Sequence, residues 1–535
     1  MKFNGIGVSE GVATGSIFYL ATPDLTVKRT DNCDVNSQLQ RFFEAVRKAK
    51  EQLQQLYDRA LESDKESAEI FHVHMMMLDD PDFTEVTEQL LNQGVNAEYA
   101  VRTAGDNLKN MLESLDDDYM KARAADVKDA TDRVIGILKG IEQTSLQPKG
   151  KVVVIAEELY PSQTMKLDKD CVVGFITQRG SQTSHSVILA RSMGIPCIVG
   201  VRNFNDIPHS GTIAMDGTTG EIFTNPSQKQ LEEINRKLLE QQQQNRQLLD
   251  YCGKAVSKCG KSMMVCANIG NPSDVRNVLS NHVDGVGLFR SEFIYLDRKT
   301  FPSEQEQFAA YKEVLEKMSP LPVVIRTLDI GSDKQAPYFN IGKEDNPAMG
   351  YRAIRICLDK EEIFVTQLRA LLRASVYGNL NIMFPMISNI EQVQQIKRIV
   401  QRVKEQLTLQ NIAFADNIPL GVMIETPASV IISDLLAKEV DFFSIGTNDL
   451  TQYTLAADRT NEKTASLFDS RNIAVLRMIE LTAKNAHANG IKVGICGESA
   501  ADTTLTQFYL NIGIDELSVS PAAVLKVKKA VSQCN

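Results

Sequence analysis

The stretch Asp441–Asp449, with the sequence Asp-Phe-Phe-Ser-Ile-Gly-Thr-Asn-Asp, contains the unit that predicts the fold of the larger part of the chain. Its apolar run Phe442–Ile445 is typical of a short buried strand, and the polar residues after Gly446 can open a helix. The same order recurs at Gly421–Ile424, which is followed by Glu425. A short apolar strand, a polar strand end and a helix make up the repeating unit of proteins with alternating strands and helices.

Eight apolar runs of this kind occur from residue 262 onward: Met263–Ala267, Gly285–Phe289, Pro322–Ile325, Ile382–Pro385, Gly421–Ile424, Phe442–Ile445, Lys492–Ile495 and Glu516–Val519. Helical patterns separate them, for example at 304–318, 360–376, 389–408 and 470–489. Eight strand–helix repeats predict a (β/α)8 barrel. An open, doubly wound sheet is the alternative, although it usually has fewer strands.

The first 260 residues follow a different plan. Residues 1–20 and 148–225 contain short β-rich runs, and they flank segments with helical periodicity that begin near Leu39 and continue at 65–78, 82–92, 96–115 and 118–143. We therefore expect an α/β multidomain chain. A β/α domain (1–20 and 148–225) holds an inserted all-helical domain (21–147), and a linker helix (226–260) leads to the barrel (261–535).

The composition excludes several classes of protein. The 535 residues carry a net charge of -10, only 6% aromatic residues and no Trp, which argues against binding to nucleic acid. No apolar run reaches the roughly 18 residues of a membrane helix, and the N-terminus lacks the apolar stretch of a signal peptide. The nine Cys are scattered without zinc-site spacing. We expect a cytoplasmic protein with reduced thiols.

The negative charge is concentrated in one segment. Asp31–Gly140 contains 23 acidic and 13 basic side chains, so this segment accounts for the whole excess. Such a surplus is most often a solvated helical surface, and the alternative is a docking face for a basic partner.

Polar residues follow the predicted strands, at the place where barrel enzymes build their active sites. They are Arg290, Arg326, Asp329, Glu425, Asn448, Asp449, Cys496 and Glu498, with Glu292 just after Arg290, and with Arg352 and Arg459 a little further along their loops. Arginine binds phosphate or carboxylate through a planar fork, and two carboxylates with open positions can hold Mg²⁺. This set predicts a site for an anion and a metal, and phosphoenolpyruvate is the smallest familiar substrate with both a phosphate and a carboxylate.

A second candidate site lies in the run Thr183-Ser184-His185-Ser186. A single His is more often structural, but His185 sits in a Gly/Ser/Thr turn that opens a helix, where backbone N–H groups can receive a phosphate. Neutral imidazole is a competent phosphoryl acceptor near pH 7. His72 and His74, in the acidic helical segment, are better explained as packing or docking residues.

These motifs together resemble the enzyme I family of the bacterial phosphoenolpyruvate:sugar phosphotransferase system. The resemblance covers nearly the whole chain and is strongest at Gly180–Arg191 with Thr-Ser-His, at Asp441–Leu455, and at Gly285–Arg290 with Gly-Leu-Phe-Arg. One departure is Ser181, which stands where the family usually has a second Gly.

The resemblance implies a role for each matching residue. His185 would be the phosphorylated histidine and Thr164 the residue that hydrogen-bonds its ring, while Cys496 would protonate the enolate carbon to give pyruvate. The implied substrate-binding set is Arg290, Arg326, Arg352, Asn448, Asp449 and Arg459, with Glu425 and Asp449 as Mg²⁺ ligands. The inserted helices would dock the phosphocarrier HPr, and the barrel would form a homodimer. The activity that the resemblance implies is transfer of the phosphoryl group of phosphoenolpyruvate through His185 to HPr, the first step of sugar uptake.

Two other functions compete with this interpretation. Relatives of pyruvate phosphate dikinase and phosphoenolpyruvate synthase share the phosphohistidine domain and the barrel. They also need a large ATP-binding domain, for which the chain has no room. A non-catalytic adaptor that only docks a carrier would not need the Arg, Glu, Asn, Asp, His and Cys positions that are intact here.

Overall fold

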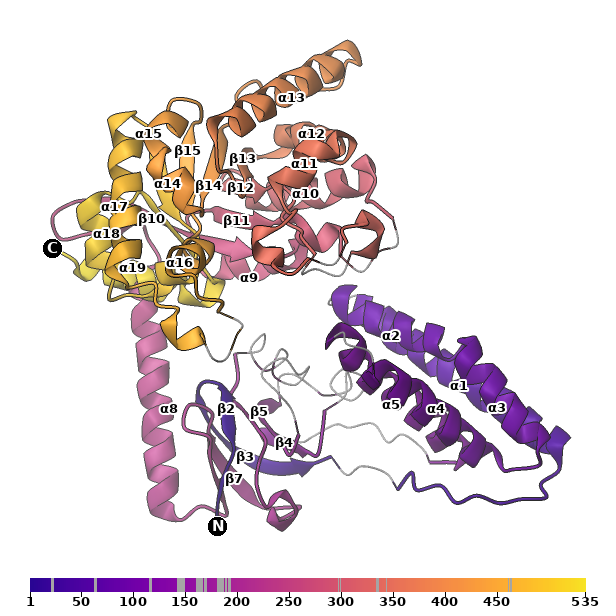
Figure 1. Ribbon diagram of the computed structural model, residues 1–535. Coiled ribbons are helices and arrows are strands. Elements are labelled where there is room, and N and C mark those ends of the chain that lie inside the picture. The colour runs from indigo at the N-terminus through magenta and orange to yellow at the C-terminus, as the bar shows by residue number, and fades with distance from the viewer. Residues whose placement is uncertain are drawn as a thin grey trace. The chain divides into compact units, whose positions relative to one another are not determined.

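The computed structural model (Figure 1) consists of two compact units, Met1–Gln244 and Asn245–Asn535. It describes the chain except residues 21–23, 62–64, 115–117, 142–149, 160–166, 168–170, 180–186, 188–189, 191–193, 297, 299, 333–335, 343, 460 and 462–463. None of the described helices is long and apolar enough to cross a membrane.

The first unit contains an eight-stranded sheet in the order β1-β8-β7-β3-β4-β5-β6-β2. Its strands are β1 (Lys2–Asn4), β2 (Ile6–Ser9), β3 (Val12–Tyr19), β4 (Val152–Ala156), β5 (Val172–Thr177), β6 (Cys197–Val199), β7 (Thr212–Asp216) and β8 (Glu221–Thr224). The parallel pairing of β3 with β4 joins segments on either side of the helical region, so that region is an insertion in the β/α domain, as predicted. Alternate residues of β4 enter two apolar clusters, so both faces of the sheet are covered.

The inserted region is a bundle of long helices with a core of its own (Figure 1). The helices are α1 (Val35–Leu61), α2 (Lys65–Met77), α3 (Pro81–Asn92), α4 (Ala97–Ser114) and α5 (Asp118–Leu138). Phe42, Leu53, Val101 and Val134 are fully buried in it. Helix α3 begins where Asp80 accepts a hydrogen bond from the N–H of Asp82, with a proline in the first turn, and this is the start that the sequence predicts.

The predicted linker is a single helix, α8 (Gln228–Leu248), followed by one 3₁₀ turn. Its first half belongs to the sheet: Ile234 is buried in an apolar cluster with strand residues, and Lys237 forms an ion pair of 2.7 Å with the buried Asp216. The helix is therefore attached to the β/α domain along its N-terminal turns.

The second unit is a closed barrel of eight parallel strands. They are β10 (Ser262–Ile269), β11 (Val286–Arg290), β12 (Pro322–Arg326), β13 (Asn379–Phe384), β14 (Leu420–Ile424), β15 (Phe442–Ile445), β16 (Lys492–Ile495) and β17 (Glu516–Val519). Closure follows because β10 pairs with both β11 and β17. Each predicted apolar run is a strand, and the barrel alternative is confirmed over the open sheet. A short strand, β9 (Ala255–Val256), adds antiparallel to β10.

The helices of the barrel also follow the predicted pattern. They are α9 (Val275–Ser280), α10 (Glu304–Met318), α11 (Ile354–Asp359), α12 (Glu361–Ala374), α13 (Ile390–Leu409), α14 (Pro427–Ile431), α15 (Ser433–Leu436), α16 (Thr447–Leu455), α17 (Ile473–Ala488), α18 (Thr506–Ile512) and α19 (Val524–Gln533). Reciprocal side-chain caps start α10 at Ser303 and α13 at Asn389. The helix predicted over 360–376 ends earlier, because its last residues form a 3₁₀ turn.

A buried lysine on α19 binds residues that precede the first strands of the barrel. Lys528 is 1% exposed, and its ammonium donates to the carbonyl oxygens of Gly253 (3.0 Å) and His282 (2.7 Å) and to Asp284 (2.8 Å). This one side chain therefore ties the last helix to the segment that enters the barrel.

Replacing Lys528 by alanine is expected to lower the free energy of unfolding of the barrel by about 3 kcal/mol, because a partly buried carboxylate loses its cation. Urea unfolding followed by circular dichroism measures this. Lys526→Ala, an exposed position on the same helix, is the control. Equal stability of the two variants would contradict the expectation.

Candidate functional site

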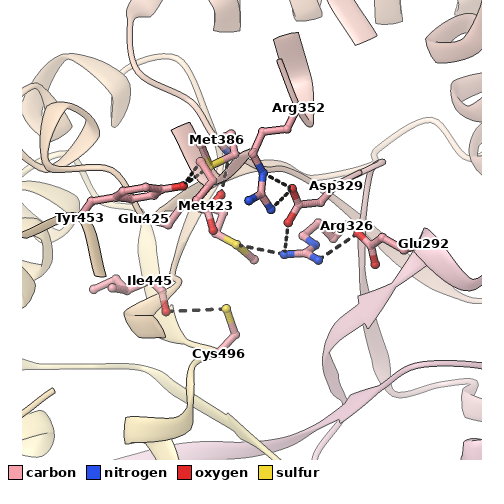
Figure 2. A network of polar contacts seen from close by, with 11 residues as sticks. Glu292, Arg326, Asp329, Arg352, Met386, Met423, Glu425, Ile445, Tyr453 and Cys496 are labelled. Atoms are coloured by element: carbon pink, nitrogen blue, oxygen red, sulfur yellow. Dashed lines mark hydrogen bonds and ion pairs between the residues drawn. The ribbon is translucent and has the colours of Figure 1, made fainter. Parts of the chain in front are cut away.

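The barrel brings most of the predicted residues of the larger site to one rim (Figure 2). Arg326 is the last residue of β12, Glu425 follows β14, and Cys496 follows β16. Asp449 lies in the first turn of α16, after β15. The strands are neighbours in the order β12-β13-β14-β15-β16. In a closed parallel barrel all carboxyl ends face the same side, so side chains far apart in the sequence converge there.

Two arginines and two carboxylates form a buried ion-pair network at this rim (Figure 2). The Nη2 group of Arg326 lies 2.9 Å from Oε1 of Glu292, and its Nη1 group lies 2.9 Å from Oδ2 of Asp329. Arg352 donates from Nη2 to Oδ1 of Asp329 at 2.9 Å. Despite burial, these carboxylates hold the pKa of both arginines above the ordinary value, so both stay charged.

Glu425 is almost completely buried, with 1% of its surface exposed. Its Oε1 accepts a hydrogen bond of 2.6 Å from the backbone N–H of Met386. Burial, together with the charges of Asp449 and Asp329, raises its pKa well above the ordinary value. A Cβ at Gly446 would lie 3.0 Å from Oε2 of Glu425, so the glycine in this motif leaves space for the carboxylate.

The residues after β15 extend the same rim. Asp449 is half-buried and close enough to Glu425 to raise its pKa. Asn448 makes a reciprocal pair with Glu498: its Nδ2 donates to Oε1 of Glu498 at 3.2 Å, and its Oδ1 accepts from the backbone N–H of Glu498 at 3.0 Å. Within the described ranges, no three His, Cys, Asp or Glu side chains form a metal-binding group, so any metal here would rely on two carboxylates and outside ligands.

Cys496 lies under the charged groups, on an apolar floor. Its side chain belongs to a buried cluster with Leu288, Val324, Met383 and Met423, and its thiol contacts the carbonyl oxygen of Ile445 at 3.6 Å. Burial raises the pKa of this thiol to about 11, even though Arg326 and Arg290 act in the opposite direction. The thiol is therefore protonated at neutral pH and can donate a proton to a group bound above it.

The four remaining predicted residues are either exposed or outside the described residues. Arg290 ends β11, directly beside Arg326 in the strand register, and its side chain is exposed. Arg459 is exposed in the segment after α16. His185 and Thr164 lie outside the described residues, so their contacts stay predictions.

Several contributors to the rim were not in the predicted set. Glu292 and Asp329 stand among the polar residues that follow the predicted strands, but the sequence assigns neither of them a role in binding substrate or metal. Tyr453 bonds to the carbonyl oxygen of Ala348, and burial raises the pKa of its hydroxyl to about 12. Met423 contacts Nη1 of Arg326 at 3.8 Å, but an apolar residue inside a strand gives no sequence signal for such a role.

Family comparisons match the whole organisation of the chain. A model of the PEP-utilising enzyme N-terminal family matches residues 4–123, the PEP-utilising mobile domain matches 148–220, and the PEP-binding domain matches 243–535. The last match alone spans more than half of the chain.

Curated relatives extend over nearly the full length. The chain is 43% identical to the phosphoenolpyruvate-protein phosphotransferase of Priestia megaterium over 99% of this chain and 94% of that protein. The protein of the same name from Bacillus subtilis is 44% identical with the same coverage. The one from Staphylococcus carnosus is 40% identical over 100% of this chain and 94% of its own length.

The difference between buried and exposed thiols gives a direct test of the environment of Cys496. Cys259 is exposed, and a hydrogen bond with Ser257 lowers its pKa. At pH 7.5 iodoacetamide should modify Cys259 about 100-fold faster than Cys496, because the thiolate is the reacting form.

Peptide mass spectrometry of the labelled chain measures both rates, and the buried Cys266, whose pKa is also raised, should be protected like Cys496. Labelling of Cys496 should speed up as the pH rises toward its pKa. Equal rates at Cys259 and Cys496 would contradict the buried, protonated thiol.

Proposed function

Because the chain belongs to the family of phosphoenolpyruvate-protein phosphotransferases, we propose that His185 takes the phosphoryl group of phosphoenolpyruvate and passes it to the phosphocarrier HPr. The chain is a transferase of the phosphotransferase system that uses phosphoenolpyruvate as its phosphoryl donor. The roles of individual residues below are part of the proposal.

The proposed first step transfers the phosphoryl group between an oxygen and a nitrogen. The P–O bond of phosphoenolpyruvate breaks while a P–N bond forms to the imidazole of His185, held in place by Thr164. The electron pair of the broken bond leaves with the enolate of pyruvate. Cys496 then gives its S–H proton to the methylene carbon of that enolate, and the thiolate regains a proton from solvent. In the second step the phosphoryl group moves from His185 to HPr.

The observation that carries this proposal is a buried thiol close to guanidinium groups of the rim: Cys496 shares its apolar cluster with Met423, and Met423 contacts Nη1 of Arg326. Arg326 and Arg352 supply guanidinium groups of the kind that bind phosphate and carboxylate, and Cys496 lies in the apolar cluster next to them. Arg290, Asn448 and Arg459 are proposed to complete the contacts to the substrate. An acid that stays protonated at neutral pH, close to bound anionic oxygens, suits an enolate that must be protonated on carbon.

The acidic pair at the rim fits a divalent metal ion, which we propose to be Mg²⁺. Glu425 is buried with a raised pKa, and its largest electrostatic cause is the neighbouring Asp449. A cation held by these two residues would offset that repulsion, and hard carboxylate oxygens with free positions for water and substrate suit Mg²⁺. When bound, it neutralises charge on the phosphate oxygens.

The helical domain is the proposed docking module for HPr. Its excess of acidic side chains produces a negative potential that would attract a carrier with a basic face and raise the encounter rate. A homodimer joined through the barrel and a cytoplasmic location complete the proposal.

His185→Ala should abolish transfer of phosphate from phosphoenolpyruvate, with a loss of at least about 10³-fold, because the nucleophile is gone. Labelled phosphoenolpyruvate and Mg²⁺, without ATP, should give an acid-labile phosphoprotein with the unchanged chain but not with His185→Ala. His209→Ala is the control, since His209 belongs to the same domain and stacks on Tyr19. A His185→Ala chain that still phosphorylates HPr would refute the assignment.

Glu425→Ala and Asp449→Ala should each raise the Mg²⁺ concentration for half-maximal activity by about 10-fold or more and sharply lower turnover. Titration of activity with Mg²⁺ measures both effects. Asp441→Ala is a matched control, since that carboxylate accepts the N–H of Leu420 at the other end of the barrel. An unchanged Mg²⁺ dependence in both variants would remove Glu425 and Asp449 from the metal site.

A further inference from the structure

One buried carboxylate joins two of the proposed substrate-binding arginines. Oδ2 of Asp329 lies 2.9 Å from Nη1 of Arg326, and Oδ1 of Asp329 accepts from Nη2 of Arg352 at 2.9 Å and from its Nε at 3.3 Å. Asp329 is 4% exposed, so water competes little for these contacts (Figure 2). Contacts to charged groups are stronger and more directional when they are shielded from water.

The backbone around these groups is also connected. Asp329 lies three residues beyond Arg326, while Arg352 reaches the site from the far end of a long loop. The N–H of Ala353 donates to the carbonyl oxygen of Ile330 at 3.0 Å, so the residues next to Arg352 and Asp329 are joined as well. Ala353 adopts a φ of 54°, a backbone conformation that is costly for alanine. The loop thus accepts local strain where it brings Arg352 to Asp329.

Carboxylates already engage several donor groups of the two arginines. Glu292 and Asp329 engage both Nη groups of Arg326, and in the part of the chain that the structure describes, its Nε has no hydrogen-bond partner. Asp329 engages the Nε and Nη2 of Arg352. The two carboxylates, Glu292 and Asp329, also balance the charges of the two guanidinium groups. The two arginines can therefore lie close together before an anion binds, despite their like charge.

We propose that Asp329 is a positioning residue for phosphoryl transfer: it holds Arg326 and Arg352 in one relative orientation and acts through them, without touching the reacting atoms. This inference rests on the proposed function. Misplacement of binding groups by about 1 Å can cost about 100-fold in rate, so a change at Asp329 should reduce catalysis. Among the described residues, Glu292 forms an ion pair with Arg326 and with no second arginine, so a change at Glu292 should have the smaller effect.

The chain contains a matched control for this arrangement. Glu304 on α10 also joins two arginines, with Oε2 at 2.6 Å from Nε of Arg369 and Oε1 at 2.6 Å from Nη1 of Arg373. These residues lie on the helices α10 and α12, and their ion pairs are not part of the network around Asp329. Glu304→Gln therefore removes a bridging carboxylate without altering the rim.

The test compares Asp329→Asn, Glu292→Gln and Glu304→Gln in the full chain, with kcat and KM for phosphoenolpyruvate measured in the presence of HPr and Mg²⁺. Asp329→Asn should lower kcat/KM by about 100-fold, mainly through kcat. Uptake of phosphate from phosphorylated HPr should be unchanged, because that reaction does not use the rim. Combining Asp329→Asn with Arg352→Ala should cost less than the product of the two single losses.

Two outcomes would overturn the inference. One is an Asp329→Asn chain with the kcat and KM of Glu304→Gln. The other is full recovery of kcat in Asp329→Glu, which would show that charge alone matters; this variant also serves if Asp329→Asn does not fold, and its kcat should stay at least about 10-fold low. An unchanged chain that takes no phosphate from phosphoenolpyruvate would instead refute the proposed function, and the inference with it.

Discussion

The closure of the parallel barrel is the constraint on which the site depends. Strand β10 pairs on one side with β11 and on the other with β17, so the sheet has no open edge and all eight strands point the same way. The residue that follows each strand must therefore come out at one rim. Arg326, Glu425 and Cys496, separated by as many as 170 positions, meet there because of hydrogen bonds between backbones and not because of any affinity among their side chains.

Within that rim, charge and apolar surface are arranged in layers. Buried carboxylates hold the guanidinium groups of Arg326 and Arg352, and the apolar cluster around Cys496 lies beneath them. The guanidinium groups stay charged because the carboxylates are close, whereas the thiol stays protonated because its surroundings are apolar. One small region thereby contains both fixed guanidinium groups and a proton donor.

The first unit shows how a chain can carry a separate module without disturbing a sheet. The parallel pair β3–β4 holds the two ends of the inserted helical bundle side by side, and the bundle has its own core around Phe42 and Val134. Helix α8 is attached to the sheet by the ion pair of Lys237 with Asp216. The N-terminal family match, residues 4–123, covers strands of the sheet as well as helices of the bundle, and the match to the mobile domain, residues 148–220, covers the later strands of the sheet.

The sequence by itself determined the eight barrel strands, the four longest barrel helices and the residues at the strand ends, because these depend on local patterns of apolar and polar side chains. Glu425 and Cys496 could be predicted as site residues for that reason. Only the tertiary structure decided that Asp329 joins Arg326 to Arg352, that the N–H of Met386 binds Glu425, and that burial keeps Cys496 protonated. These features depend on the path of long loops and on the exclusion of water, and both arise from contacts between residues distant in the chain, which no local pattern records.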